Sequence, residues 1–91
     1  MIRPLSSNLT LNGFAYTMIL QEGRKYLYRQ TVTPGIEYFE VFIANIGEEL
    51  TIQGRFYPRR HLFPRNEDFG FTAWSCRTYS QAKEIFNKLQ D

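Results

Sequence analysis

Residues 55–65 hold the densest group of chemistry-bearing side chains in the sequence, with four arginines and three aromatic residues in eleven positions. Guanidinium groups neutralise phosphates, and aromatic rings stack on unpaired bases, so this composition is typical of a surface that binds single-stranded DNA or RNA. The same side chains also suit contact with another macromolecular partner. The candidate binding residues are Arg55, Tyr57, Arg59, Arg60, His61, Phe63 and Arg65.

The segment also has a purely structural interpretation. Pro58 and Pro64 remove backbone donors and disfavour a continuous helix or strand, which predicts a loop over residues 55–68. In that loop the aromatic side chains would pack into the core. The arginines would stay solvated or pair with the nearby acidic residues, which are Glu48, Glu49, Glu67 and Asp68.

Catalytic candidates are few. His61 is the only histidine, and Glu67 and Asp68 follow it closely, so an acid–base pair or a metal site is conceivable, but a solvated loop histidine is the more common case. Cys76 alternates with Trp74, which favours a small core residue over a nucleophile. The sequence has no glycine-rich phosphate loop, paired-histidine motif or acidic calcium loop. We therefore expect no catalytic residues, no metal and no cofactor.

Composition predicts one domain over residues 1–91, because a chain of this length builds a single core. The apolar share of 43% and the charged share of 22% are ordinary for a folded protein, and a net charge of +2 does not by itself require a polyanionic partner. The single cysteine excludes an internal disulfide and favours a reducing compartment, so we expect a cytoplasmic protein. Residues 14–20 form the longest near-continuous apolar run, which is too short for a membrane span.

The hydrophobic pattern predicts an antiparallel meander. Residues 1–13 are expected to be irregular, and Thr33-Pro34-Gly35-Ile36 has the composition of a type II turn. The third strand is apolar on both faces, which is typical of a strand covered on two sides. The predicted strands are residues 14–20, 25–32, 36–46, 50–53 and 69–76.

A helix is predicted over residues 79–90. Thr78 and Gln81 have the spacing of a capping box, and an apolar stripe follows at helical intervals. The fold class is therefore α+β, with about five antiparallel strands and one C-terminal helix packed on one face of the sheet. The predicted core comprises Val41, Phe42, Trp74, Ile85, Phe86 and Leu89.

One helix covers one face of a sheet, so the other face needs a second cover. Two covers are possible. The segment 55–68 folds back with Phe56, Tyr57 and Phe63, or a second copy of the chain docks there across a twofold axis. The second possibility makes a homodimer the expected assembly.

Two stretches and one strand resemble a known group of proteins. Residues 12–30 contain Asn-Gly-Phe, Tyr-Thr, Glu-Gly and Leu-Tyr-Arg-Gln, residues 63–89 contain Asp-Phe-Gly, Ala-Trp and the closing helix, and Phe39-Glu40-Val41-Phe42 lies between them. Together they resemble small uncharacterised proteins encoded by phages, prophages and mobile elements of bacteria. The resemblance implies that setting and names no reaction.

A second analogy concerns topology alone. A meander followed by a helix is the order found in single-strand DNA-binding domains of the transcriptional-coactivator and Whirly type. We expect a non-catalytic accessory protein of a phage or mobile element that binds another macromolecule, with a protein as the first choice of partner. Binding of single-stranded DNA or RNA through residues 55–65 is the alternative.

Overall fold

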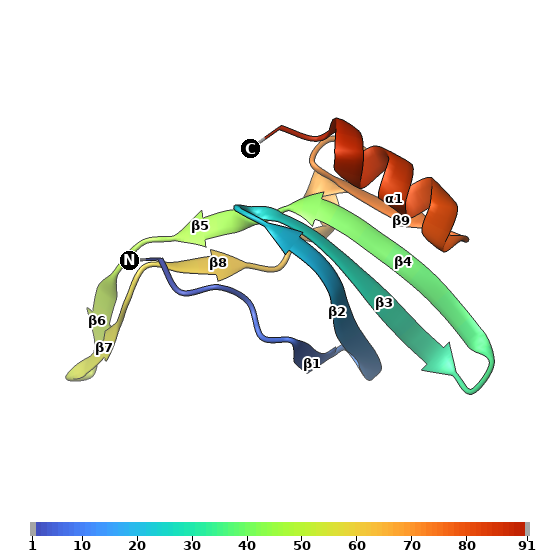
Figure 1. Ribbon diagram of the computed structural model, residues 1–91. Helices are drawn as coiled ribbons and strands as arrows, with labels where there is room; N and C mark the ends of the chain where they lie inside the picture. The colour runs from blue at the N-terminus through green and yellow to red at the C-terminus, as the bar shows by residue number, and fades with distance from the viewer. Residues whose placement is uncertain (1, 91) are drawn as a thin grey trace.

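The body of the protein is a five-stranded antiparallel sheet with one helix (Figure 1). The computed structural model describes residues 2–90. Strands β1 (Asn8–Leu11), β2 (Phe14–Glu22), β3 (Lys25–Thr33), β4 (Ile36–Ile43) and β9 (Ala73–Cys76) lie side by side in that order. The predicted α+β class with an antiparallel sheet and one C-terminal helix is confirmed. Among residues 2–90, no helix combines the length and the apolar character that crossing a membrane requires.

Tight turns set the register of the first strands. Gly35 has φ of 86°, which the predicted turn at Pro34-Gly35 requires. Asn12 and Gly13 have φ of 53° and 84°, so they form the kind of two-residue turn that joins twisted strands, and they pair β1 with β2. The prediction of an irregular segment over residues 1–13 is therefore wrong for residues 8–11, because this turn folds them into an edge strand.

Helix α1 (Tyr79–Lys88) lies over β3, β4 and β9 (Figure 1). Thr78 is its N-cap, and Thr78 Oγ1 accepts a hydrogen bond from the Gln81 backbone N–H at 3.2 Å. The helix ends two residues before the predicted boundary at residue 90, because Leu89 is extended and its carbonyl accepts a hydrogen bond from Lys25 Nζ. One buried cluster joins the helix to the sheet and comprises Leu27, Val41, Cys76, Ala82 and Phe86.

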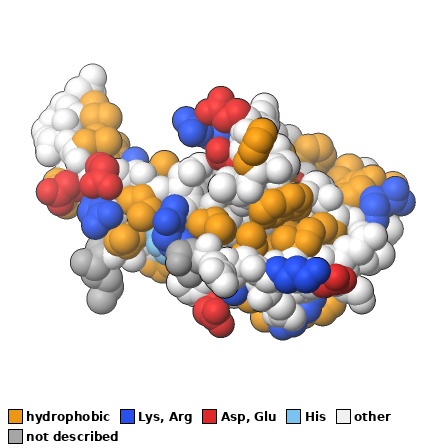
Figure 2. All heavy atoms as spheres, turned by 90° about the horizontal axis from the view of Figure 1, so that it is seen from above, with side chains coloured by type: hydrophobic (Ala, Val, Ile, Leu, Met, Phe, Trp, Pro, Cys, Tyr) orange, Lys and Arg blue, Asp and Glu red, His pale blue; other side chains and the backbone are white. Residues whose placement is uncertain are grey.

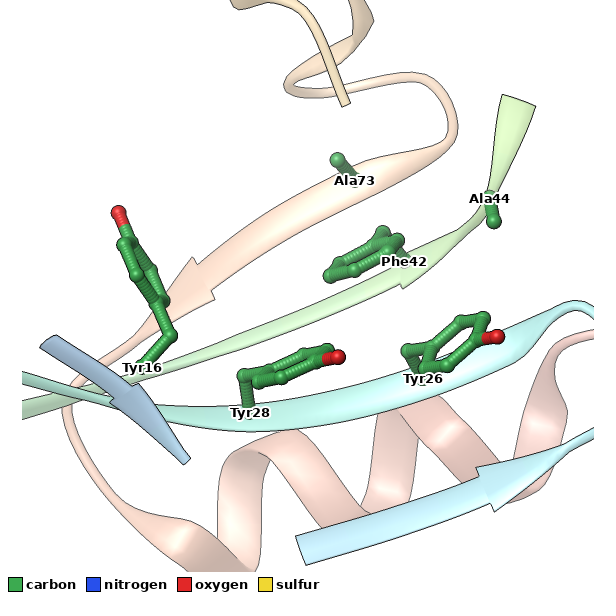
Figure 3. Close-up of a cluster of buried hydrophobic side chains, with 6 residues drawn as sticks. All are labelled: Tyr16, Tyr26, Tyr28, Phe42, Ala44 and Ala73. Atoms are coloured by element: carbon green, nitrogen blue, oxygen red, sulfur yellow. The ribbon is translucent and has the colours of Figure 1, made fainter. Parts of the chain in front are cut away.

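An aromatic cluster occupies the other face of the sheet (Figure 3). Tyr26, Tyr28 and Phe42 project from β3 and β4 toward the same side, and their rings stack with centroids 5.5–5.9 Å apart. Tyr16 of β2 meets Tyr28 edge to face. Offset and edge-to-face contacts of this kind add to the stabilisation from burial alone. Of the predicted core residues, Val41, Phe42 and Phe86 are buried, whereas Trp74, Ile85 and Leu89 are half-buried beside the helix cluster.

Two segments of the same chain cover this aromatic face. Residues 2–7 cross it, where the Leu5 N–H donates to Tyr26 Oη at 3.1 Å and Tyr28 Oη donates to the Ser6 carbonyl. Phe63 packs edge to face on Phe42 at 4.9 Å between centroids. The predicted return of residues 55–68 to the sheet is thus partly right, since Phe63 packs on this face and Phe56 does not. The contribution of residues 2–7 was not predicted.

Residues 45–62 form an arm that extends away from the sheet (Figure 1). Strand β5 (Asn45–Gly47) pairs with β8 (Arg60–Leu62) near the body, and β6 (Leu50–Ile52) pairs with β7 (Arg55–Tyr57) at the tip. A short 3₁₀ helix, η1 (Asn66–Asp68), follows. The structure of the arm shows that three predictions from the sequence were wrong. The predicted strand 36–46 breaks at Ala44, residues 50–52 do not join the main sheet, and the predicted loop 55–68 contains two strands.

Candidate functional site

The arm carries most of the predicted binding residues, but the structure divides them. Arg55, Tyr57 and Arg59 lie toward its outer part, whereas Arg60 and His61 lie on β8 near the body. Phe63 packs into the aromatic face of the sheet, and Arg65 precedes η1. The candidate residues therefore do not form one continuous surface.

The outer part of the arm exposes apolar side chains on both sides of its two-stranded ribbon. Ile52 is 55% exposed and Phe56 is 60% exposed. The register pairs Leu50 with Tyr57 and Ile52 with Arg55, so these four side chains share one side, and Phe56 lies on the opposite side opposite Thr51. Hydrophobic atoms are visible along the projecting arm at the left of Figure 2. Exposed large apolar groups on a projecting ribbon are typical of a contact surface.

A tight turn builds the tip of the arm. Gln53 and Gly54 have φ of 50° and 78°, so both central residues of the turn lie in the left-handed region that two-residue hairpins require. The turn joins β6 directly to β7, so that Ile52 pairs with Arg55. A glycine at the second turn position was therefore the sequence signal for this hairpin.

Most arginines of the segment are held by neighbouring groups. Arg59 Nε lies 3.4 Å from Glu48 Oε2, and Arg65 Nη1 lies 3.1 Å from Glu67 Oε1. The guanidinium of Arg60 donates to the Pro58 carbonyl at 3.1 Å. These pairings agree with the structural interpretation of the segment, in which the arginines satisfy nearby acceptors.

Tyr57 is bracketed by two cations. The guanidinium carbons of Arg55 and Arg60 lie 6.0 and 5.9 Å from the centre of its ring. These distances lie at the outer limit for attraction between a cation and an aromatic ring, and the Tyr57 ring is half-buried. Arg55 is exposed and is the arginine closest to the tip of the arm.

His61 links the arm to the body of the protein. Its Nδ1 lies 2.7 Å from Tyr26 Oη, and its backbone N–H donates to the Arg3 carbonyl at 2.7 Å. Asp68 is engaged elsewhere, since its Oδ2 accepts hydrogen bonds from the Arg65 N–H and from Asn45 Nδ2. These bonds hold the pKa of Asp68 below its usual value. The expectation of a solvated loop histidine is therefore wrong, because His61 is half-buried against the sheet.

No group of three or more histidine, cysteine, aspartate or glutamate side chains suited to a metal occurs among residues 2–90. Cys76 is buried under the helix, as predicted for a core residue. Burial, and secondarily the charge of Glu40, raises the pKa of its thiol, which disfavours the thiolate that a nucleophile needs.

Sequence reasoning missed a buried carboxyl group on the aromatic face. Glu40 of β4 is 6% exposed, and its Oε2 is buried without a hydrogen-bond donor. Burial raises its pKa to about 7. The available signal was a glutamate inside the run Phe39-Glu40-Val41-Phe42, in a strand expected to be covered on both faces.

Comparison with known proteins adds no relative: no family model, no curated protein and no solved structure matches the chain. The resemblance to phage and mobile-element proteins stays an expectation.

Proposed function

We propose that this is a non-catalytic binding protein of the cytoplasm and that the arm is the surface that contacts its partner, which is another protein. The observation that carries this proposal is the exposure of Leu50, Ile52 and Phe56 on β6 and β7, which form a two-stranded sheet of their own that projects from the body (Figure 1). An isolated ribbon of this kind is marginally stable alone, so burial in a partner's groove would stabilise it. We further propose that the protein is an accessory protein of a phage or mobile element.

The charge of the arm favours a protein over a nucleic acid. Residues 45–62 contain three arginines and two glutamates, a small positive excess, and Arg59 is paired with Glu48. Nucleic-acid affinity comes mainly from cations that neutralise phosphates. Aromatic residues and arginine are instead enriched at protein–protein interfaces, and tyrosine and arginine are frequent hot spots there.

The test is capture of partners from host extract with three forms of the protein. Phe56→Ser should abolish capture, because it removes the most exposed apolar side chain of the arm. Phe71→Ser is the matched control, since Phe71 is 80% exposed and lies outside the arm. Equal capture by all three forms would exclude the arm as the contact surface.

Self-association is measured first, because the homodimer is also a proposal. The aromatic face has its cover within the chain, so a dimer across that face is not needed to bury it. If two copies pair through their arms, sedimentation at micromolar concentration should report a dimer that Phe56→Ser dissociates. That result would make the second copy the partner.

Single-stranded nucleic acid is the second candidate, and the stacked group of Arg55, Tyr57 and Arg60 is the observation in its favour. If the arm binds oligonucleotides, the affinity should fall steeply with salt, and Tyr57→Ala should weaken binding by about 1–3 kcal/mol. Absence of oligonucleotide binding near about 50 mM salt would exclude this candidate, since counterion release is strongest at low salt.

A further inference from the structure

A pocket beside the aromatic face is lined in part by Glu40, whose side chain is buried. The pocket has a volume of about 350 Å³ and lies between β2, β4, the turn after β1 and the segment that follows β8. Tyr16, Phe63 and Phe69 contribute aromatic rings, and Asn12 and Asn66 contribute amides, to the same lining as Glu40. This pocket is separate from the outer arm.

The carboxyl group is the unusual member of this lining. Glu40 Oε2 is buried and receives no hydrogen bond, although buried carboxylates are normally paired. Among the residues that line the pocket, all of them described, none is a lysine or an arginine. A ligand that brings a positive charge into the pocket would offset the charge of the ionised Glu40 carboxyl group.

The aromatic rings favour a positive charge over a neutral donor. The Tyr16 and Phe63 rings meet edge to face with centroids 4.9 Å apart, and the face of an aromatic ring attracts cations. A buried carboxylate that is walled by aromatic rings is therefore complementary to an alkylammonium group, with the alkyl part against the rings and the ammonium on the carboxylate.

We propose that the pocket bounded by Tyr16, Glu40 and Phe63 binds an alkylammonium group, with Glu40 as the counter-ion. A free small amine and a lysine side chain of a peptide share this chemistry. Asn12 and Asn66 offer further hydrogen-bonding groups at the pocket, which would fix the orientation of a ligand larger than the ammonium itself.

The ionisation of Glu40 gives the proposal a pH signature. The titratable groups near its carboxyl are the phenols of Tyr16 on β2 and Tyr28 on β3 and the thiol of Cys76 on β9. Burial raises the pKa of each of them, so all three keep their protons at neutral pH. Only Glu40 in this group changes charge near neutrality, and an ammonium ligand binds its ionised form.

The experiment is an NMR titration of the whole protein with n-butylammonium chloride at about pH 8.5 and about pH 5.5, on either side of the pKa of Glu40. The amide signals of Asn12 and Asn66 should shift at the higher pH. Binding should be weaker by about tenfold or more at the lower pH, where the carboxyl is mostly protonated. The neutral analogue 1-butanol should bind weakly at both pH values.

Two variants and one further ligand complete the test. Glu40→Gln should weaken n-butylammonium binding by about tenfold or more, and Glu37→Gln, an exposed carboxyl on the same strand, should leave it unchanged. Tighter binding of N-acetyl-lysine amide than of n-butylammonium would assign the pocket to a lysine side chain, and the reverse order to a free amine. Equal binding at both pH values, equal binding of 1-butanol, or no shift at millimolar n-butylammonium overturns the proposal.

Discussion

Phe42 and Phe56 lie in two regions with opposite surroundings. Phe42 is fully buried on the sheet, where it contacts the rings of Tyr26, Tyr28 and Phe63, whereas Phe56 is mostly exposed on the arm. Both residues lie on strands and next to other apolar residues in the sequence. A hydrophobic strand therefore becomes part of the core only where other segments of the chain cover it.

The largest expected effect separates these two phenylalanines. Phe42→Ala should lower the free energy of unfolding by about 3–5 kcal/mol, because it removes a buried ring from a close-packed cluster. Phe56→Ala should change it by less than about 0.5 kcal/mol, since an exposed side chain makes few contacts. Urea unfolding of both variants measures the difference. A loss with Phe56→Ala that matches the loss with Phe42→Ala would show that the arm belongs to the core.

The second prediction concerns the carboxyl group inside the aromatic region. Because the pKa of Glu40 is raised from 4.5 to about 7, the folded protein keeps this proton where the unfolded chain loses it. Its contribution to stability is therefore complete below about pH 4.5 and is lost as the pH rises through about 7, a change of up to about 3 kcal/mol. Glu40→Gln lacks this dependence.

Urea unfolding at about pH 4.5 and about pH 8 measures that difference, since the two values bracket the titration of Glu40. The stability of Glu40→Gln relative to the unsubstituted protein should rise between them. Glu37→Gln is the control, because its carboxyl is exposed and paired with Arg29. A constant difference between Glu40→Gln and the unsubstituted protein at both pH values would contradict a buried, protonated Glu40.

The sequence pattern predicted the strands of the main sheet better than the structure of the arm. In residues 14–20 and 25–32 the side chains alternate between the two faces of the sheet, and Pro34-Gly35 marks the turn that follows residues 25–32. The local sequence pattern and the fold therefore agree in this region. The pattern of Leu50 and Ile52 also predicted a strand correctly. It did not show which strand would be the partner, because the turn at Gln53-Gly54 brings residues 55–57 back alongside residues 50–52.

The candidate site stays a prediction. Composition marked residues 55–65 as aromatic and basic, but spacing alone did not show that Arg59 pairs with Glu48 or that His61 contacts Tyr26. These contacts join residues far apart in the chain, and they depend on the path of residues 2–7 and of the arm. Glu40 was missed because its unusual property, a raised pKa, follows from the burial of its side chain in the folded protein.

The third prediction tests the junction between the two regions. Tyr26→Phe keeps the ring but removes the hydroxyl that contacts the Leu5 N–H and His61 Nδ1. The loss of these two hydrogen bonds should lower the free energy of unfolding by about 1–2 kcal/mol. Hydrogen exchange of the Leu5 amide should accelerate, whereas that of amides in α1 should change only with global stability. Unchanged exchange at Leu5 would show that residues 2–7 are held by other contacts.

The smallest effect is expected at the ion pair on the arm. Arg59 and Glu48 are both largely exposed, with 45% and 72% of their side chains accessible, so solvent and salt screen their attraction. Arg59→Ala should therefore change the free energy of unfolding by less than about 0.5 kcal/mol. A double-mutant cycle with Glu48→Ala measures the coupling directly, and it should fall further when salt is added. Coupling above about 1 kcal/mol would mean that the pair rigidifies the arm, and the arm would then meet its partner as a preformed ribbon.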